Sequence, residues 1–162
     1  MKMKTLLTAA IALTFFTHNS TTFGNSNFSA QELNYEAFGT WGSHDREDFD
    51  DSEIGIGVGV NYFFTENFGV GADTYVEDID LPNHLDLSLI GRLPLSAVPL
   101  APYAFAGFGR QWSDVSQWTG HLGLGVEYRW KSKTGIFLDF REVFADKSKD
   151  ISLFRLGVRC GF

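Results

Sequence analysis

The chain has 162 residues, a formal net charge of -7 and 44% hydrophobic residues, and 15% of its residues are aromatic. This length predicts one domain. The acidic balance argues against a nucleic-acid partner, because phosphate binding needs clustered Lys and Arg and the sequence contains no such cluster. After the first two dozen positions, no apolar run approaches the roughly 18 residues of a membrane helix, which excludes a helical membrane protein.

The first 24 residues are predicted to be an export signal. Lys2 and Lys4 supply a positive region, and residues 6–16 form an apolar core. Thr22 and Gly24 are small residues at the two positions that a signal peptidase reads, which places cleavage after Gly24. Residues 25–162 would then form one mature domain.

After the signal, seven segments are expected to be strands. Apolar residues alternate along them with polar residues or glycines, more regularly in some segments than in others. They cover residues 33–41, 54–62, 68–77, 85–92, 103–111, 120–130 and 136–143. Three glycines on one face of residues 54–62 favour a crowded interior in which side chains from other strands need space. Residues 103–111 carry small or aromatic residues on both faces, so the register of this strand stays open.

The last twelve residues, 151–162, also alternate with a period of two. Apolar residues on one face oppose Arg155 and Arg159 on the other. Such a strand needs hydrocarbon against one face and a polar, confined space against the other, which is the condition in the wall of a membrane β-barrel. The edge strand of a soluble sandwich is the alternative. Cys160 lies on the apolar face and has no assigned role; as the single cysteine it cannot form an internal disulfide.

The connections predict the topology. Short turns at 63–67 and 131–134 alternate with longer charged loops at 43–52, 78–83, 112–118 and 145–150. Residues 93–102 hold three of the four prolines and are expected to be a connection, because proline cannot donate to a strand ladder. The fold class is therefore all-β, an eight-stranded antiparallel up-and-down transmembrane barrel. The acidic loop 45–51 would face the cell exterior.

The inward faces carry the candidate site, a network of charges in the barrel interior. Arg159 is expected to pair with some of Glu36, Glu127 and Asp139, with Arg155 and Arg141 in a layer above. The full set is Glu36, Asp73, Asp86, Arg92, Glu127, Arg129, Asp139, Arg141, Arg155 and Arg159.

Four segments and the last residue carry a resemblance to a known family: Tyr103–Arg110, Gly123–Trp130, Phe144–Lys147, Phe154–Arg159 and Phe162. They resemble the small eight-stranded outer-membrane β-barrel family that includes the OmpA transmembrane domain and OmpX-like proteins. The resemblance implies location in the bacterial outer membrane, with outer-membrane lipid, lipopolysaccharide and the barrel assembly machinery as partners, and a monomeric state. It also implies an assembly signal formed by Phe154, Leu156, Val158 and Phe162. The peptidoglycan-binding domain of full-length OmpA is not implied.

The favoured function is a structural or surface-interaction barrel with a largely plugged lumen, without enzymatic activity or cofactor. A narrow pore, a lipid-modifying barrel enzyme and a soluble barrel of lipocalin type are the alternatives. For an enzyme the candidates are His44, His84 and His121, but His84 and Ser88 on one strand lie about 13 Å apart at strand rise. The acidic loop lacks the glycine and glutamate spacing of a calcium-binding loop, so no metal site is predicted.

Overall fold

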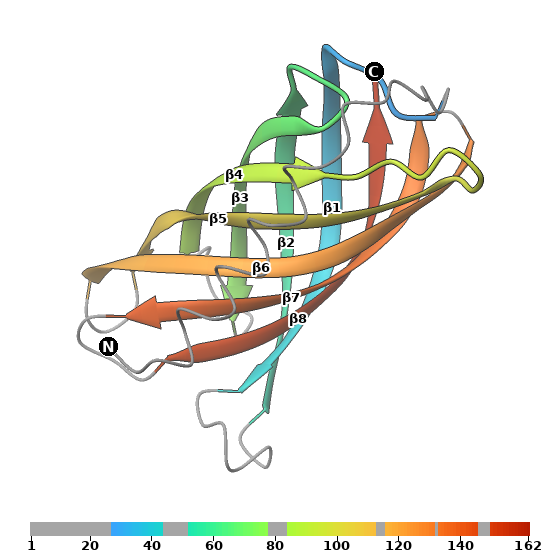
Figure 1. The fold of residues 1–162 in the computed structure, drawn as a ribbon. Helices are drawn as coiled ribbons and strands as arrows, with labels where there is room; N and C mark the ends of the chain where they lie inside the picture. The colour runs from blue at the N-terminus through green and yellow to red at the C-terminus, as the bar shows by residue number, and fades with distance from the viewer. Residues whose placement is uncertain (1–26, 44–51, 78–83, 113–115, 132, 146–149) are drawn as a thin grey trace, which may run out of the picture.

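The computed structural model describes residues 27–43, 52–77, 84–112, 116–131, 133–145 and 150–162. In them, eight strands form one closed antiparallel barrel in sequential order (Figure 1), which confirms the predicted fold class. The predicted signal and the acidic loop 45–51 lie outside the described residues. The strands are β1 (Glu32–Ser43), β2 (Ser52–Phe63), β3 (Phe68–Glu77), β4 (His84–Arg92), β5 (Leu100–Trp112), β6 (Ser116–Lys131), β7 (Thr134–Ala145) and β8 (Ile151–Gly161).

The barrel closes by pairing its first and last strands. Ten residue pairs join β1 to β8, from Asn34 opposite Gly161 to Ser43 opposite Ser152. The start of β1 and the C-terminus therefore lie at one end of the barrel, which we call the terminal end, at the top of Figure 1. The opposite end is the loop end. No helix of the described residues is long and apolar enough to cross a bilayer.

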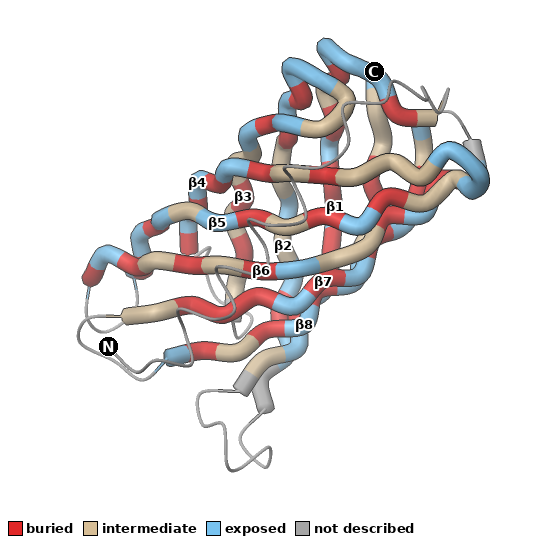
Figure 2. The backbone as a smooth tube through the Cα atoms, in the orientation of Figure 1, coloured by how far each residue is buried: buried red, intermediate tan, exposed pale blue. Residues whose placement is uncertain are grey.

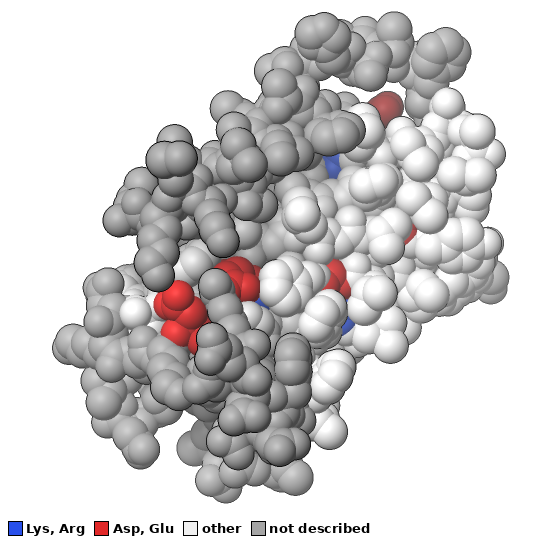
Figure 3. All heavy atoms as spheres, turned by 60° about the horizontal axis from the view of Figure 1, so that its bottom comes forward, with Lys and Arg blue, Asp and Glu red and all other residues white. Residues whose placement is uncertain are grey.

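Burial alternates along each strand because successive side chains point to opposite faces of the wall (Figure 2). The outward side chains are almost all apolar, and several are more exposed than is usual for a protein in water: Ile54 is 75% exposed, Ile56 70% and Leu89 70%. In the view of Figure 3, most of the described surface is neither acidic nor basic. An apolar surface this continuous marks a face that lies against another apolar phase.

Aromatic residues flank this aliphatic surface at both ends. At the terminal end, the rings of Tyr35 and Phe162 meet edge to face with centroids 5.4 Å apart. Towards the loop end, Phe154 contacts both Trp41 and Phe140, at 6.1 Å and 5.1 Å. An apolar band between two aromatic girdles is the outer surface typical of membrane barrels.

Glycines on the inner face of β2 make room for side chains of the neighbouring strands. A Cβ atom at Gly57 would lie 2.5 Å from the ring of Phe38, and one at Gly59 would lie 2.8 Å from a carboxylate oxygen of Glu36. The interior of an eight-stranded barrel is only wide enough for side chains, and here the bulky Phe38 and Glu36 each have a glycine opposite them, Gly57 and Gly59. This is the crowding that the glycine face predicts.

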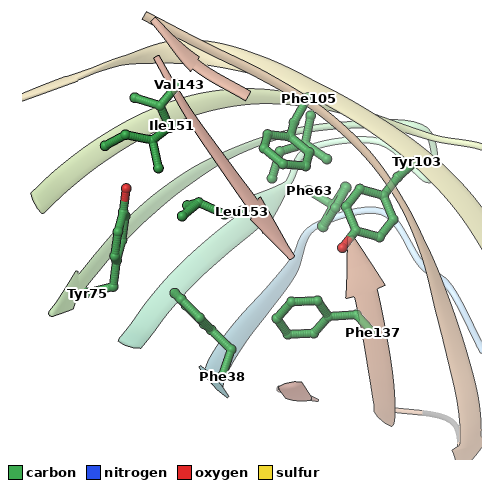
Figure 4. Packing of buried hydrophobic residues seen from close by; sticks show 10 residues of the cluster. Phe38, Phe63, Tyr75, Tyr103, Phe105, Phe137, Val143, Ile151 and Leu153 are labelled. Carbon is green, nitrogen blue, oxygen red and sulfur yellow. The ribbon is translucent and has the colours of Figure 1, made fainter. Parts of the chain in front are cut away.

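The interior also holds an apolar cluster of ten residues, shown in Figure 4. Val143, Ile151 and Leu153 lie close together in one part of it, and Phe38 and Phe137 meet edge to face with centroids 6.2 Å apart in another. These apolar side chains pack in the interior together with its charged groups.

The structure corrects the expected boundaries of β5. The sequence analysis treats residues 93–102 as a connection, yet β5 begins at Leu100 and includes Pro102. The carbonyl of Pro102 accepts a hydrogen bond from the amide of Leu93 at 2.8 Å, just beyond the last paired residue of β4. Proline is tolerated here because its backbone nitrogen, which carries no hydrogen, lies where the ladder between β4 and β5 ends.

Other boundaries also differ. Trp112 and Trp118, expected in a loop, lie in β5 and β6, and Phe63, expected in a turn, is a fully buried residue of β2. The open register of β5 is resolved by cross-strand pairing, with Tyr103 and Phe105 pointing inward and Ala106 and Phe108 outward. These shifts lengthen the wall without changing the topology.

Candidate functional site: the charged interior

The structure places all ten candidate network residues inside the barrel, each 6% exposed or less. Burying a charge is costly unless it is paired, so the partners of each group decide whether this arrangement is stable. The pairs form four clusters along the barrel axis.

The cluster at the terminal end is centred on Glu32, which the sequence analysis missed. The guanidinium of Arg129 donates to both carboxylate oxygens of Glu32, at 2.6 Å and 3.0 Å, and Arg92 donates to one of them at 3.2 Å. Glu32 shares the inward parity of Asn34 and Glu36, which was the signal available in the sequence. It precedes residue 33, the expected start of the first strand, so the sequence pattern does not include it.

Residues 27–29 cover this cluster at the mouth of the barrel. The ring of Phe28, 2% exposed, lies 4.4 Å from the guanidinium carbon of Arg129 and 5.1 Å from that of Arg92. Arg129 also donates to the carbonyl of Asn27 at 2.5 Å, and Arg92 to the carbonyl of Ser29 at 3.1 Å. Cation–π contacts and charged hydrogen bonds together hold the segment in the mouth.

Replacing Phe28 by alanine is therefore expected to release residues 27–29 while the strands stay paired. The amide of Ser29, which donates to Glu32 at 3.1 Å, should lose most of its protection from hydrogen exchange, whereas amides of β1 and β2 keep theirs. Phe64→Ala, which removes a 48% exposed ring from a turn at the same end, is the control. Equal loss of protection throughout β1 would mean that Phe28 supports the whole barrel and not only its mouth.

The second cluster is centred on Arg159. Its guanidinium donates to Glu36 at 2.7 Å and to Glu127 at 2.6 Å. Glu127 also accepts a hydrogen bond from Arg129 at 2.5 Å, which joins this cluster to the first. Asp139, the third acid expected as a possible partner of Arg159, pairs with a different arginine, Arg155.

Asp139 belongs to the third cluster. It lies directly opposite Arg155 in the register of β7 and β8, and Arg155 donates to both of its oxygens at 2.7 Å and 2.9 Å. The hydroxyl of Tyr103 donates to Asp139 at 2.6 Å, and the Tyr103 ring lies 5.3 Å from the guanidinium carbon of Arg159. Tyr103 therefore bridges the second and third clusters, a role that could not be predicted while the register of its strand was open.

The fourth cluster is centred on Arg141, which is completely buried. Arg141 donates to both oxygens of Asp73, at 2.7 Å and 3.1 Å, and to a carboxylate oxygen of Asp86. Asp73 also lies 3.4 Å from Arg155, so the third and fourth clusters share an acid. Charged and aromatic contacts thus run almost the whole length of the interior.

Beside the fourth cluster lies a Ser–His–Asp arrangement that the sequence analysis also missed. Ser88 Oγ lies 2.8 Å from Nε2 of His121, and Nδ1 of His121 lies 3.7 Å from Asp86. A catalytic triad needs its acid within hydrogen-bond reach of the histidine, and 3.7 Å exceeds that reach. Asp86 is instead bound by Arg141, and Ser88 and His121 are enclosed by the wall, so the geometry does not assemble an activated nucleophile.

Of the other two candidate histidines, the structure describes only His84. His84 stacks on the ring of Tyr75 with centroids 4.3 Å apart, and His44 lies outside the described residues. Within the described part of the chain, no group of three or more His, Cys, Asp or Glu side chains could hold a metal ion.

The predicted assembly-signal residues form one outward row on β8 and at the C-terminus. The exposed side chains are Phe154, Leu156, Val158 and Phe162. The amide of Phe162 donates to the carbonyl of Leu33 at 2.8 Å, which fixes the last residue beside the start of β1.

Comparison with known proteins identifies the fold but not a family. No protein-family model matches the sequence. No curated protein matches it either. The N-terminal β-barrel domain of Pseudomonas aeruginosa OprF has a similar structure, with a TM-score of 0.67 and 19% identity over 83% of this chain and 99% of that chain.

Two further structures extend the comparison. A de novo designed transmembrane β-barrel has a TM-score of 0.63 and 14% identity, over 82% of this chain and 97% of that chain. Ail, the attachment invasion locus protein of Yersinia pestis, has a TM-score of 0.58 and 12% identity, over 82% of this chain and 99% of that chain. The chain has the fold of the small outer-membrane β-barrels.

Proposed function

We propose that residues 1–24 are an export signal and that residues 25–162 form a small barrel protein of the bacterial outer membrane. It acts as a structural or surface-interaction protein and not as an enzyme, and its lumen is plugged. The observation that carries this proposal is the inverted distribution of side chains. Five arginines and their acids fill the interior, while aliphatic side chains with aromatic girdles cover the outside.

The proposed partners follow from this surface. The aliphatic band contacts outer-membrane lipid and lipopolysaccharide, and the barrel assembly machinery inserts the chain as a monomer. No nucleic acid is expected, because five of the six described arginines point inward. Ail, with the same fold, has been solved in a phospholipid bilayer nanodisc and in complex with the heparin analogue sucrose octasulfate. These structures support lipid contact along the wall and ligand contact at the surface.

The experiment that tests the proposal combines gel mobility with conductance. A closed barrel in a bilayer resists detergent until heated, so unboiled and boiled samples should migrate differently, and the protein should fractionate with the outer membrane. In planar bilayers, a lumen filled by ion pairs should pass no steady current. Steady single-channel conductance would show that the barrel is a narrow pore and not plugged. Equal mobility of unboiled and boiled samples would contradict the proposal that it is a membrane barrel.

Removal of Phe162 is expected to reduce the outer-membrane yield sharply, because the side chain is proposed to be read by the assembly machinery. Phe162→Ala separates this effect from stability, since it retains the backbone hydrogen bond to Leu33. Both variants should still fold when refolded into detergent. Phe64→Ala is again the control. Normal yield of heat-modifiable protein from the chain ending at Gly161 would show that Phe162 carries no such signal.

A further inference from the structure

The outer wall over β3, β4 and β5 is hollowed. The hollow has a volume of about 440 Å³, which lies in the range of about 300–1,000 Å³ typical of small-molecule sites. Two rows of outward residues line its floor across these strands, Ala72, Leu87 and Phe108 in one row and Val70, Leu89 and Ala106 in the next. Alanines stand where other strands carry larger side chains, and they create the depth.

Arg110 lies one row of residues beyond this hollow, towards the loop end. On β5 it follows Phe108 by two residues and so has the same outward side, and it stands opposite Leu85 on β4 and Trp118 on β6. It is therefore an exposed cation next to the loop-end edge of an apolar groove. Of the six arginines that the structure describes, the other five lie inside the barrel.

Among the described residues, the surroundings of Arg110 hold the guanidinium without neutralising it. Its Nε and one Nη donate to the hydroxyl of Ser116, at 3.3 Å and 3.1 Å. The rings of Trp112 and Trp118 lie 5.8 Å and 5.7 Å from its central carbon. Within the described ranges no carboxylate forms an ion pair with it, in contrast to each of the five interior arginines.

We propose that Arg110, Trp112 and Trp118 together with the hollow bind one phosphorylated membrane lipid of the outer leaflet. Its headgroup phosphate meets the guanidinium, and one acyl chain lies in the hollow. Arginine matches phosphate geometry through paired N–H donors, and tryptophan is enriched at the depth of lipid headgroups. The inference rests on the proposed membrane location. The apolar hollow lies next to the cation on the side of the terminal end, which favours a lipid over a soluble anion.

The test measures lipid retention by native mass spectrometry on the refolded barrel in a non-ionic detergent. The probes are dimyristoyl phosphatidic acid and dimyristoylglycerol, which share their chains and differ only in the headgroup phosphate. The unaltered protein should retain the phosphatidic acid about tenfold more strongly, the effect of one additional charged hydrogen bond. Arg110→Gln should abolish this preference, and Ala106→Phe, which fills the hollow, should weaken retention of both lipids.

Lys133→Gln, which removes an exposed cation at the terminal end, is the matched control and should leave the preference unchanged. Equal retention of both lipids by the unaltered protein would overturn the proposal, as would an undiminished preference in Arg110→Gln. Displacement of the lipid by equimolar inorganic phosphate would reduce the site to one for free phosphate. A dimer that excludes both lipids would assign the groove to a second copy. Heat-modifiability in vesicles, measured in parallel, reports separately on the proposed membrane location.

Discussion

Replacing Arg141 by methionine is expected to lower the free energy of unfolding by about 3–5 kcal/mol, the cost of leaving buried charges without their partner. Arg141 is completely buried and binds Asp73 and Asp86 at once. Methionine retains most of the length of the side chain but none of the charge, so two carboxylates in one confined layer lose their shared cation. Asp73 keeps only the more distant contact with Arg155 at 3.4 Å.

Urea unfolding in detergent, followed by tryptophan fluorescence, measures this effect. Arg110→Met is the matched control, because it removes an arginine from the outer wall and should change stability by no more than about 0.5 kcal/mol. Adding Asp86→Asn to the Arg141 variant should recover part of the loss, since it removes one stranded charge. A cost below about 1 kcal/mol for Arg141→Met would indicate that water screens these groups and that the interior is open.

The sequence predicts all eight strands, and the period-two pattern predicts the direction of the side chains in seven of them. In a barrel wall each residue faces either the confined interior or the outer phase, so the sequence must alternate between two chemistries. Residues 54–62 show this most clearly, with aliphatic residues outward and glycines inward. A designed transmembrane barrel shares this fold at 14% sequence identity.

The pattern could not predict features that depend on neighbouring strands. Residues 103–111 carry small or aromatic residues on both faces, so only pairing with β4 and β6 decides that Tyr103 points inward to Asp139. Ser88 on β4 and His121 on β6 are 33 positions apart in the sequence and contact each other across β5. Spacing within one strand cannot reveal such a contact. Phe28 lies outside any strand and is placed by two arginines that come from β4 and β6.

Two features of the outer wall are not required by the fold. A closed barrel needs an apolar outside and a filled inside, and the interior clusters meet that second need. It does not need an exposed arginine beside two tryptophans on its outer wall, nor a hollow next to that arginine. These features therefore distinguish this chain from a generic barrel, and we expect its ligand selectivity to depend on them.

A double-mutant cycle on Arg159 and Glu127 tests whether the interior clusters act as a unit. Each single change to leucine should cost about 3–5 kcal/mol, because Arg159→Leu strands Glu36 and Glu127, and Glu127→Leu removes an acid shared by Arg159 and Arg129. The double variant should cost less than the sum of the two, with a coupling energy of about 0.5–3 kcal/mol. Urea unfolding in detergent gives all three values.

Conductance of the same three variants distinguishes a packed interior from a watery one. In a packed interior the neighbouring rings of Phe137 and Tyr103, at 4.7 Å and 5.3 Å from the Arg159 guanidinium carbon, keep the lumen filled after one pair is lost. All three variants should then remain without steady conductance while their stabilities differ. Small and independent stability effects of roughly 0–1 kcal/mol, the value for screened pairs, together with steady conductance in every variant, would make this barrel a narrow pore.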